Sequence, residues 1–288
     1  FPFSFISFPP FMVIGFYIFF KELFLSPCVR STLLSAFFFG FGHNLFGMHW
    51  IFFPLTFDER FINFAPITPI IFASFFALFI CFPSLFIYFF IKKPLLKKHL
   101  YLSSFLIAIF FYSSELLRSK IFGGFPWNLY GHIWSFNENF FGIVRYIGIS
   151  GLSFLTIFWI VLISQKIILK KFKDSAVLLL ILPVFLVLTS ISYEEEMIDS
   201  IKVRVVQPNI PQDIKWSKEH MKDNMNTLIK LSFKEKGSPN LIIWPEVSVP
   251  LFLNKSIGTI EYLSSLLPKE TYLLLGSLRI EGRKTFNS

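Results

Sequence analysis

The segment Ile242–Glu246, with the sequence Ile-Ile-Trp-Pro-Glu, ends in the residue best placed to do chemistry in this chain. Its hydrophobic residues are typical of a buried strand, its proline ends that strand, and a carboxylate follows at the C-terminal end. Parallel α/β folds place their reactive groups at this end of the sheet. A carboxyl group set against apolar neighbours such as Trp244 could act as a general base. Glu246 is therefore the candidate base; the alternative is a surface carboxylate near a helix start, where the helix dipole favours it.

Several other polar residues fall inside long apolar runs, where burying an unpaired polar group is costly. His43, Asn44 and His49 share one run, and we expect His43 and Asn44 to face other helices and not lipid. They could line an interior groove for a lipid tail or headgroup, or they could only form hydrogen bonds between helices. Glu115 and Arg118 are spaced i, i+3 on one helix face, so we expect them to pair with each other.

Composition predicts a membrane protein, because 54% of the 288 residues are hydrophobic and an ordinary soluble domain needs more polar surface. The formal net charge of +9 arises from basic residues in short clusters between apolar runs. Such clusters suit loops that face anionic lipid headgroups, and they argue against a nucleic-acid partner. Cys28 lies in a loop and Cys81 in an apolar run, so neither indicates a disulfide framework or a metal cluster. We expect no metal and no cofactor.

The elements that must position these residues begin with a membrane domain. A spanning helix needs about 20 apolar residues at a rise of about 1.5 Å each. We therefore expect residues 1–193 to form a polytopic domain with about six transmembrane helices. The expected spans are Phe1–Phe20, Leu33–Leu55, Ala65–Ile91, His99–Leu117, Tyr146–Gln165 and Ser175–Tyr193.

Basic residues cluster in two connecting segments, Lys92–Lys98 and Lys166–Lys173, and loops rich in lysine stay in the cytoplasm. The segment Arg118–Arg145 between them then lies on the opposite face of the membrane. Within it, Trp127 and Trp134 fit an aromatic belt at the membrane interface. The chain crosses the membrane once more after Lys166–Lys173, so everything after the last span also lies outside the cytoplasm.

The hydrophobic pattern changes after residue 193 from long apolar runs to short alternating ones, which marks a domain boundary. We expect residues 194–288 to form part of an extracytoplasmic α/β domain with the element order β-α-β-α-β. Half of a layered α/β domain would leave one apolar sheet face without a partner. The expected strands are Ile201–Gln207, Asn240–Trp244 and Thr271–Leu278, and the expected helices are Lys218–Lys236 and Ile257–Leu267.

Several segments together resemble the apolipoprotein N-acyltransferase family. The segment Val205–Gln212 (VVQPNIPQ), the Lys-Trp pair that ends at Trp216, and Glu246 thirty residues further on resemble the opening of that family's catalytic domain. The segment Gly124–Asn128 (GFPWN) follows a helix that ends in Glu-Leu-Leu-Arg and resembles a motif of the family's membrane domain. The resemblance extends over nearly the whole chain.

The resemblance implies an acyltransferase of the bacterial inner membrane that moves an acyl chain from a phospholipid to the diacylglyceryl-modified N-terminal cysteine of an apolipoprotein. It implies a multi-pass α-helical membrane domain followed by a nitrilase-like domain, an α-β-β-α sandwich, on the periplasmic face. The mechanism would pass through a cysteine thioester formed by a Glu-Lys-Cys triad. Glu246 matches the glutamate of the triad, which accepts the proton. Trp216 matches a tryptophan that would contact the lipid substrate or serve only as a buried anchor.

The resemblance also implies that much of the active site lies beyond this chain. The lysine and cysteine of the triad would follow residue 288, and the family's first membrane helix would be missing or truncated before Phe1, so we expect residues 1–288 to be inactive alone. Cys28 cannot replace the cysteine, because it lies on the predicted cytoplasmic side and a nucleophile must be within reach of its base. Two alternatives stay open: a membrane-anchored nitrilase-type amidase, and an inactive product of a split or decaying gene. Six spans argue against the amidase, which needs at most one anchor.

Overall fold

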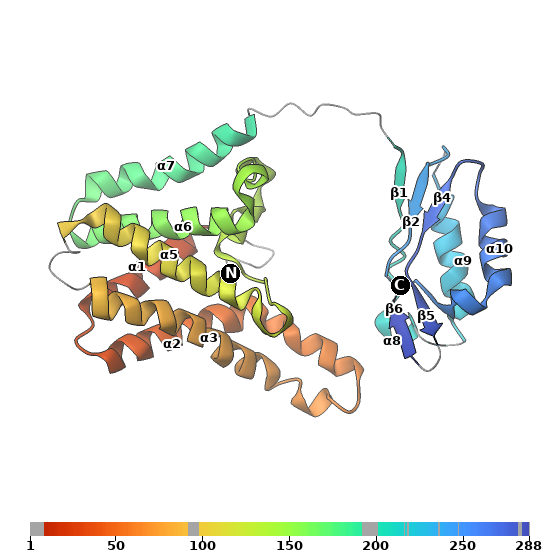
Figure 1. Ribbon diagram of the computed structural model, residues 1–288, viewed down its shortest axis with the longest axis horizontal. Coiled ribbons are helices and arrows are strands. Elements are labelled where there is room, and N and C mark those ends of the chain that lie inside the picture. The colour runs from red at the N-terminus through yellow and green to blue at the C-terminus, as the bar shows by residue number, and fades with distance from the viewer. Residues whose placement is uncertain are drawn as a thin grey trace. The chain divides into compact units, whose positions relative to one another are not determined.

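The computed structural model of the chain contains two compact units, Phe1–Glu194 and Glu195–Ser288, which we call unit 1 and unit 2 and describe separately (Figure 1). Unit 1 consists of helices, whereas unit 2 combines strands and helices. The structure describes residues 9–91, 98–191, 201–215, 217, 219–235, 237–246, 248–281 and 284–287.

Long apolar helices dominate the described part of unit 1. An α-helix suits apolar surroundings because it satisfies the hydrogen bonds of its own backbone. The long helices are α1 (Pro9–Leu25), α2 (Val29–Met48), α3 (Thr68–Phe86), α5 (Leu100–Arg118), α6 (Val144–Ile168) and α7 (Phe172–Ile191). Four described helices are long and apolar enough to cross a membrane: Thr68–Ile91, Leu100–Arg118, Val144–Ile168 and Phe172–Ser190.

The predicted second span, Leu33–Leu55, is wrong at both ends. Helix α2 begins at Val29 and ends at Met48, and the segment His49–Phe57 forms the 3-10 helix η1. Pro54 within η1 has no N–H to donate, so it cannot continue an α-helix. The four spans found correspond to the last four of the six predicted runs, and neither α1, with 17 described residues, nor α2 is among them.

Short helical turns connect the long helices of unit 1 and hold several of the polar residues described below. Helix α3 continues into the π-helix η3 (Ile87–Ile91). The remaining turns are the 3-10 helices η2 (Ile62–Phe64), η4 (Ile121–Gly123), η5 (Tyr130–Phe136) and η6 (Glu138–Phe140).

Helices α2 and α3 approach each other most closely at Gly40. A Cβ atom at this position would lie 2.9 Å from the Cα atom of Ala77, closer than real Cβ contacts. Small residues allow helix backbones in membranes to come together in this way, where van der Waals packing drives association. At Gly42, two residues further along α2, an added Cβ would meet open space within 4 Å.

The core of unit 1 is largely aromatic. Phe16 and Phe20 of α1 are almost fully buried, as is Phe111 of α5. The ring of Phe20 lies edge-on to that of Phe111 at 5.5 Å, and the ring of Phe16 lies edge-on to that of Tyr130 at 5.4 Å. Such pairs add to the stability that burial alone provides. The many phenylalanines of the sequence therefore form a packed interior as well as part of the exposed surface.

Polar side chains link neighbouring helices inside unit 1. The side-chain oxygen of Gln165 in α6 accepts a hydrogen bond from the Ser103 hydroxyl of α5 at 3.3 Å. The indole N–H of Trp134 donates to the Thr156 hydroxyl at 2.9 Å, and Trp134 is only 2% exposed. Its expected position in an interfacial belt is therefore wrong, because its polar end has a partner inside the unit. Trp127, by contrast, is 49% exposed.

The first sheet of unit 2 is parallel, with the strand order β1-β2-β4. Helix α9 follows β1 and helix α10 precedes β4, and both pack on the same side of the sheet (Figure 1). The expected β-α-β-α-β order is confirmed for the strands of this sheet and the two helices that cover it, with α8 as an additional short helix. The elements are β1 (Val203–Val205), α8 (Gln212–Lys215), α9 (Met221–Ser232), β2 (Leu241–Ile243), α10 (Ile257–Leu266) and β4 (Tyr272–Leu274). Their shared core consists of Val206, Leu228, Ile242, Trp244 and Leu263.

A second sheet, which the sequence did not predict, has the strand order β3-β5-β6. The predicted strand Thr271–Leu278 is wrong, because β4 ends at Leu274 and β5 begins at Ser277 in the other sheet. Between them, the carbonyl of Gly276 accepts a hydrogen bond from the N–H of Ser248 at 3.1 Å. A continuous apolar run does not reveal such a change of partner strand. The strands are β3 (Val249–Phe252), β5 (Ser277–Glu281) and β6 (Lys284–Asn287).

The two faces of the β1-β2-β4 sheet differ. Because side chains alternate along a strand, the residues on either side of the central, helix-facing position point away from α9 and α10. On this second face Val203 and Val205 of β1 are 50% and 73% exposed, and Tyr272 and Leu274 of β4 are 74% and 58% exposed. Within unit 2 this face is apolar and open to solvent.

We expect Gly40→Ala to lower the thermal unfolding midpoint of the protein in detergent, because the new methyl group would meet the Ala77 backbone at 2.9 Å. Overpacking of this kind costs about 1–3 kcal/mol. Gly42→Ala is the matched control on the same helix, and its midpoint should not fall, since the added carbon meets open space. Differential scanning fluorimetry of the two variants checks the close approach, which equal midpoints would contradict.

We expect Ser232→Ala to loosen unit 2. The Ser232 hydroxyl accepts the indole N–H of buried Trp244 at 2.8 Å, and a buried donor left without a partner costs about 1–3 kcal/mol. Hydrogen exchange of the amides in Leu241–Ile243, followed by mass spectrometry, should become faster. Ser265→Ala, at an exposed position of α10, is the control and should leave the exchange unchanged.

Candidate functional site

Glu246 lies just past the carboxyl end of β2, the central strand of the parallel sheet. Backbone hydrogen bonds hold this end of the strand on both sides. The N–H of Val206 donates to the carbonyl of Ile243 at 2.9 Å, and the N–H of Trp244 donates to the carbonyl of Leu274 at 2.9 Å. The sheet therefore positions the residues that lead to Glu246 through its backbone, whatever the side chains are.

The side chains of Trp244 and Glu246 lie in different environments. Trp244 is 5% exposed and donates its indole N–H to Ser232 of α9, whereas Glu246 is exposed. The apolar setting that the sequence predicted for Glu246 from its neighbour Trp244 is therefore not found, because Trp244 is held in the core under the helices. An exposed carboxylate at a strand end is accessible to a reacting group.

Lys215, at the end of α8, is close to Glu246 in space. Its Nζ atom donates a hydrogen bond to the backbone carbonyl of Glu246 at 3.2 Å. From the sequence, Lys215 stands out only as part of the Lys-Trp pair of the family resemblance, which predicts no contact with Glu246. Trp216, the other residue of that pair, lies outside the described residues.

In unit 1, the carboxylate of Glu115 anchors η5 to α5. Glu115 is 5% exposed, and its Oε2 atom accepts a hydrogen bond from the backbone N–H of Tyr130 at 2.8 Å. The Ser153 hydroxyl of α6 is a second hydrogen-bonding partner of this carboxylate. Tyr130 is the first residue of η5, and the N–H groups at the start of a helical turn have no partner within the turn. A carboxylate that accepts a hydrogen bond from such a group is favoured.

The predicted pairing of Glu115 with Arg118 is wrong. Among the described residues no nitrogen–oxygen distance between them is 4.0 Å or less, so they form no ion pair. The guanidinium of Arg118 lies over the ring of Phe76 instead, with its central carbon 5.6 Å from the ring centre. The spacing i, i+3 allows the two side chains to pair. In the structure Glu115 instead contacts Tyr130 of η5, and Arg118 contacts Phe76 of α3.

A small polar cavity of about 20 Å³ lies at the centre of this cluster. Arg118 and Asn128 are among its lining residues, and Nη1 of Arg118 and Nδ2 of Asn128 are buried without a hydrogen-bond partner in the described part of the chain. Asn128 has the left-handed backbone conformation, with φ of 53°, and an added Cβ at Gly47 would lie 2.1 Å from its Nδ2 atom. The GFPWN motif is therefore packed tightly against α2.

Burial favours the uncharged forms of Tyr130 and His132, both in η5. Burial raises the pKa of the Tyr130 hydroxyl, and the nearby Glu115 carboxylate raises it further. Burial lowers the pKa of His132, and the positive charge of Arg118 adds to this effect. The structure thus identifies Tyr130 as a buried polar partner that sequence reasoning missed.

His43 and Asn44 differ in what they contact. The amide nitrogen of Asn44 donates to the carbonyl of Gly40 in its own helix at 2.8 Å, so it does not need a neighbouring helix. The ring of His43 lies parallel to that of Phe39 at 6.2 Å and also faces Tyr130 at 5.9 Å. His49 lies outside α2 and is exposed, with Nδ1 3.0 Å from the carbonyl oxygen of Phe46.

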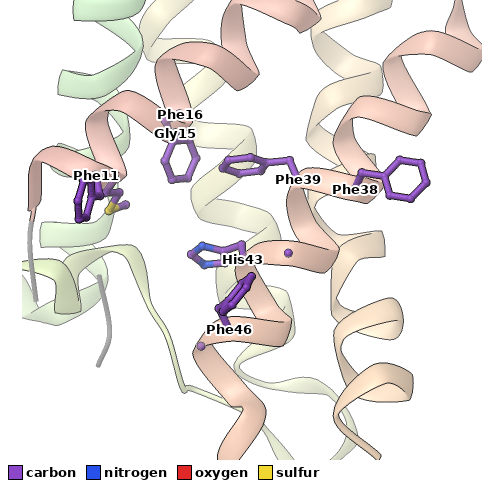
Figure 2. Close-up of a pocket in the computed structure, with 10 residues that line it drawn as sticks. Phe11, Gly15, Phe16, Phe38, Phe39, His43 and Phe46 are labelled. Atoms are coloured by element: carbon purple, nitrogen blue, oxygen red, sulfur yellow. The ribbon is translucent and has the colours of Figure 1, made fainter. Parts of the chain in front are cut away.

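A cavity of about 730 Å³ lies between α1 and α2. Figure 2 shows Phe39 and His43 pointing from α2 toward Phe16 of α1, while Phe38 points away from it. Among the described residues that line this cavity, His43 is the one titratable group, and the cavity supports the sequence-based alternative of an interior groove for His43. The lining residues are Phe11, Met12, Gly15, Phe16, Phe38, Phe39, Gly42, His43, Phe46 and Gly47.

A second groove, of about 470 Å³, lies beside the first turns of α3. The ring of Phe125, from the GFPWN motif, stacks on that of Phe76 at 4.8 Å and forms part of its wall. Of the lining residues that the structure describes, Arg118 is the one that carries a charge. The lining residues are Ile71, Phe72, Phe75, Phe76, Arg118, Ile121, Gly124 and Phe125.

The two cysteines are free thiols in unit 1, Cys28 exposed and Cys81 buried. Over the ranges that the structure describes, no group of three His, Cys, Asp or Glu side chains is arranged to hold a metal ion.

Comparison with known proteins identifies the family. Residues 1–163 match the family described as "Apolipoprotein N-acyltransferase N-terminal domain". This match covers more than half of the chain and includes α1, α2, α3, α5 and most of α6.

Curated relatives with the name apolipoprotein N-acyltransferase extend the similarity into unit 2. The protein of Rhodopseudomonas palustris is 27% identical over 268 residues, which are 87% of this chain and 49% of the relative. That of Rickettsia bellii is 32% identical over 83% of this chain and 48% of the relative, and that of Rickettsia prowazekii is 36% identical over 73% and 42%. The chain thus spans about half the length of the curated relatives it matches. It is a membrane protein and belongs to the apolipoprotein N-acyltransferase family.

Proposed function

We propose that this chain carries the membrane unit and the glutamate-bearing part of the catalytic unit of a phospholipid:apolipoprotein N-acyltransferase. The reaction moves an acyl chain from a phospholipid to the α-amine of the N-terminal diacylglyceryl-cysteine of an apolipoprotein. The observation that carries the proposal is the family match, which joins a helical membrane unit to a unit with Glu246 at the carboxyl end of its central strand.

In the proposed reaction Glu246 is the general base. It takes the proton of a cysteine thiol, whose sulfur attacks the ester carbonyl of the phospholipid, and the proton passes to the leaving lysophospholipid oxygen. The acyl chain stays on the sulfur as a thioester until the acceptor amine attacks it and restores the thiol. We place the lysine and the cysteine of this triad downstream of residue 288.

Two local features support a substrate site at this end of the sheet. Glu246 is exposed, so a thiol or amine can reach its carboxylate. Lys215 donates to the backbone carbonyl of Glu246, and Trp216 follows Lys215 directly in the chain. We propose that Trp216 contacts the lipid substrate, as the family resemblance implies. A purely structural role as an anchor would leave substrate affinity unchanged in Trp216→Ala.

The open face of the β1-β2-β4 sheet supports the α-β-β-α architecture for unit 2. Helices α9 and α10 cover one face, and the other presents exposed Val205 and Tyr272. Apolar surface of this kind is stabilised when a second sheet packs on it at about 10 Å. We propose that the remaining part of the catalytic domain supplies this sheet.

Charge supports an inner-membrane location with unit 2 on the periplasmic face. Lys166, Lys170, Lys171 and Lys173 cluster where α6 ends and α7 begins, and clustered lysines mark the cytoplasmic side. Unit 2 follows α7, so it would start on the opposite side. Four packed spans also favour an enzyme of lipid substrates over an anchored amidase, which needs one anchor at most.

We expect Glu246→Gln, in the chain continued by its downstream half, to retain its fold and lose most acyl transfer. A positioned acid-base group contributes about 10²- to 10⁴-fold to a rate. The measurement is hydroxylamine-sensitive label on protein after incubation with a phospholipid carrying a labelled acyl chain. Glu261→Gln, at an exposed position of α10, is the control for loss of one carboxylate. Thioester formation at the normal rate in Glu246→Gln would show that another residue is the base.

We expect reporter fusions after Phe172 and after Ser238 to give opposite results. Phe172 begins α7 at the lysine-rich loop, and Ser238 lies in unit 2 between α9 and β2. A reporter that is active only in the periplasm should work at Ser238 and fail at Phe172, because the lysine cluster keeps its loop in the cytoplasm. Activity of the periplasmic reporter at Phe172 would show that the orientation is the opposite of the proposed one.

A further inference from the structure

Arg118 is a buried cation whose hydrogen-bonding capacity is not filled. It is 7% exposed, and its Nη1 atom has no hydrogen-bond partner among the described residues. Glu115, one turn earlier, is not within ion-pair distance, because its carboxylate is bound to Tyr130 and Ser153. A buried guanidinium with an unused donor is costly, so an oxygen acceptor from outside the chain would stabilise it.

The groove beside Arg118 is shaped for an apolar chain. Its volume of about 470 Å³ lies within the range of about 300–1,000 Å³ that small-molecule sites have. Among the described residues that line it, all except Arg118 and Gly124 are isoleucine or phenylalanine. Ile71 and Phe75, one turn apart on α3, are 56% and 39% exposed, so the groove is accessible from the helix surface.

The groove and the Arg118 guanidinium lie at the depths in the membrane where the acyl chain and the headgroup of a lipid lie. Arg118 is the last residue of a 19-residue span, which is about 28 Å long and thus comparable to the hydrocarbon core of a bilayer, about 30 Å thick. The guanidinium is therefore at the level of the headgroups. The lining residues of α3 lie in the first three turns of that helix, so a chain in the groove runs from this level toward the interior.

We propose that unit 1 binds a membrane phospholipid in this groove, with a phosphate oxygen accepting a hydrogen bond from Arg118 and an acyl chain lying along Ile71, Phe72 and Phe75. Arginine binds phosphate well because its N–H groups form a planar fork. The small cavity of about 20 Å³ next to Asn128 has room for about one water molecule, so it cannot hold the headgroup itself. This site deepens the proposed function, which takes its acyl chain from a phospholipid, but binding here needs no acyl transfer.

The test uses the full chain in nanodiscs with two photoactivatable probes that share the same diazirine-bearing acyl chains. One probe is phosphatidylglycerol and the other is diacylglycerol, which lacks the phosphate. After irradiation, peptide mass spectrometry should locate the phosphatidylglycerol label on Thr68–Phe86 and on the segment 121–125. Labelling by diacylglycerol at these peptides should be weaker, because it offers no phosphate to Arg118.

Three variants separate the contributions. Arg118→Gln should reduce phosphatidylglycerol labelling about tenfold, as expected for a lost charge-assisted hydrogen bond, and should leave diacylglycerol labelling unchanged. Ile71→Trp should reduce labelling by both probes, because the larger side chain fills the groove. Ile70→Trp is the matched control: it is the neighbouring exposed residue on α3, does not line the groove, and should leave both unchanged.

Equal labelling of the wild type by the two probes would overturn the phosphate contact, and equal effects of Ile70→Trp and Ile71→Trp would overturn the groove. If Arg118→Gln fails to fold, Arg118→Lys retains the charge and Ile71→Trp still tests occupancy. Glu246→Gln should label normally. In the chain continued by its downstream half, labelling without transfer activity would contradict the proposed function and leave this site standing.

Discussion

The hydrogen bond from the backbone N–H of Tyr130 to the carboxylate of Glu115 is the interaction on which the interior of unit 1 depends. A carboxylate that is 5% exposed within an apolar span needs a donor, and η5 supplies one from the chain that follows α5. This bond ties the loop after α5 back onto the helix bundle. It also takes Glu115 away from Arg118, whose guanidinium then lies over Phe76 beside the groove at α3.

Tight packing around the GFPWN motif follows from the same docking of the loop. Phe125 stacks on Phe76, and the Asn128 amide occupies space that exists only because residue 47 is glycine. These contacts make one wall of the groove and one wall of the small polar cavity from residues that are far apart in sequence. The GFPWN motif therefore contributes packing contacts, whereas Arg118 contributes the positive charge of the site.

In unit 2, residues of the single segment Ile242–Glu246 have different roles, some in the core and one as the candidate base. Along Ile242–Glu246 the alternation of side chains places Ile242 and Trp244 in the core, and the strand ends before Glu246, which is exposed past the carboxyl end of β2. The helices that bury Trp244 cover only one face of the sheet, which is why the opposite face remains apolar and open in unit 2.

The amino-acid sequence alone determined the membrane character, the change of architecture near residue 193, the β-α-β-α-β order and the position of Glu246 after a buried strand. These follow from local composition and periodicity, which each segment carries by itself. Tertiary structure alone decided the partners of Glu115 and Arg118, the burial of Trp134, the second sheet and the closeness of Lys215 to Glu246. Each of these depends on which distant segment lies opposite a given side chain, and spacing within one helix or strand does not encode that.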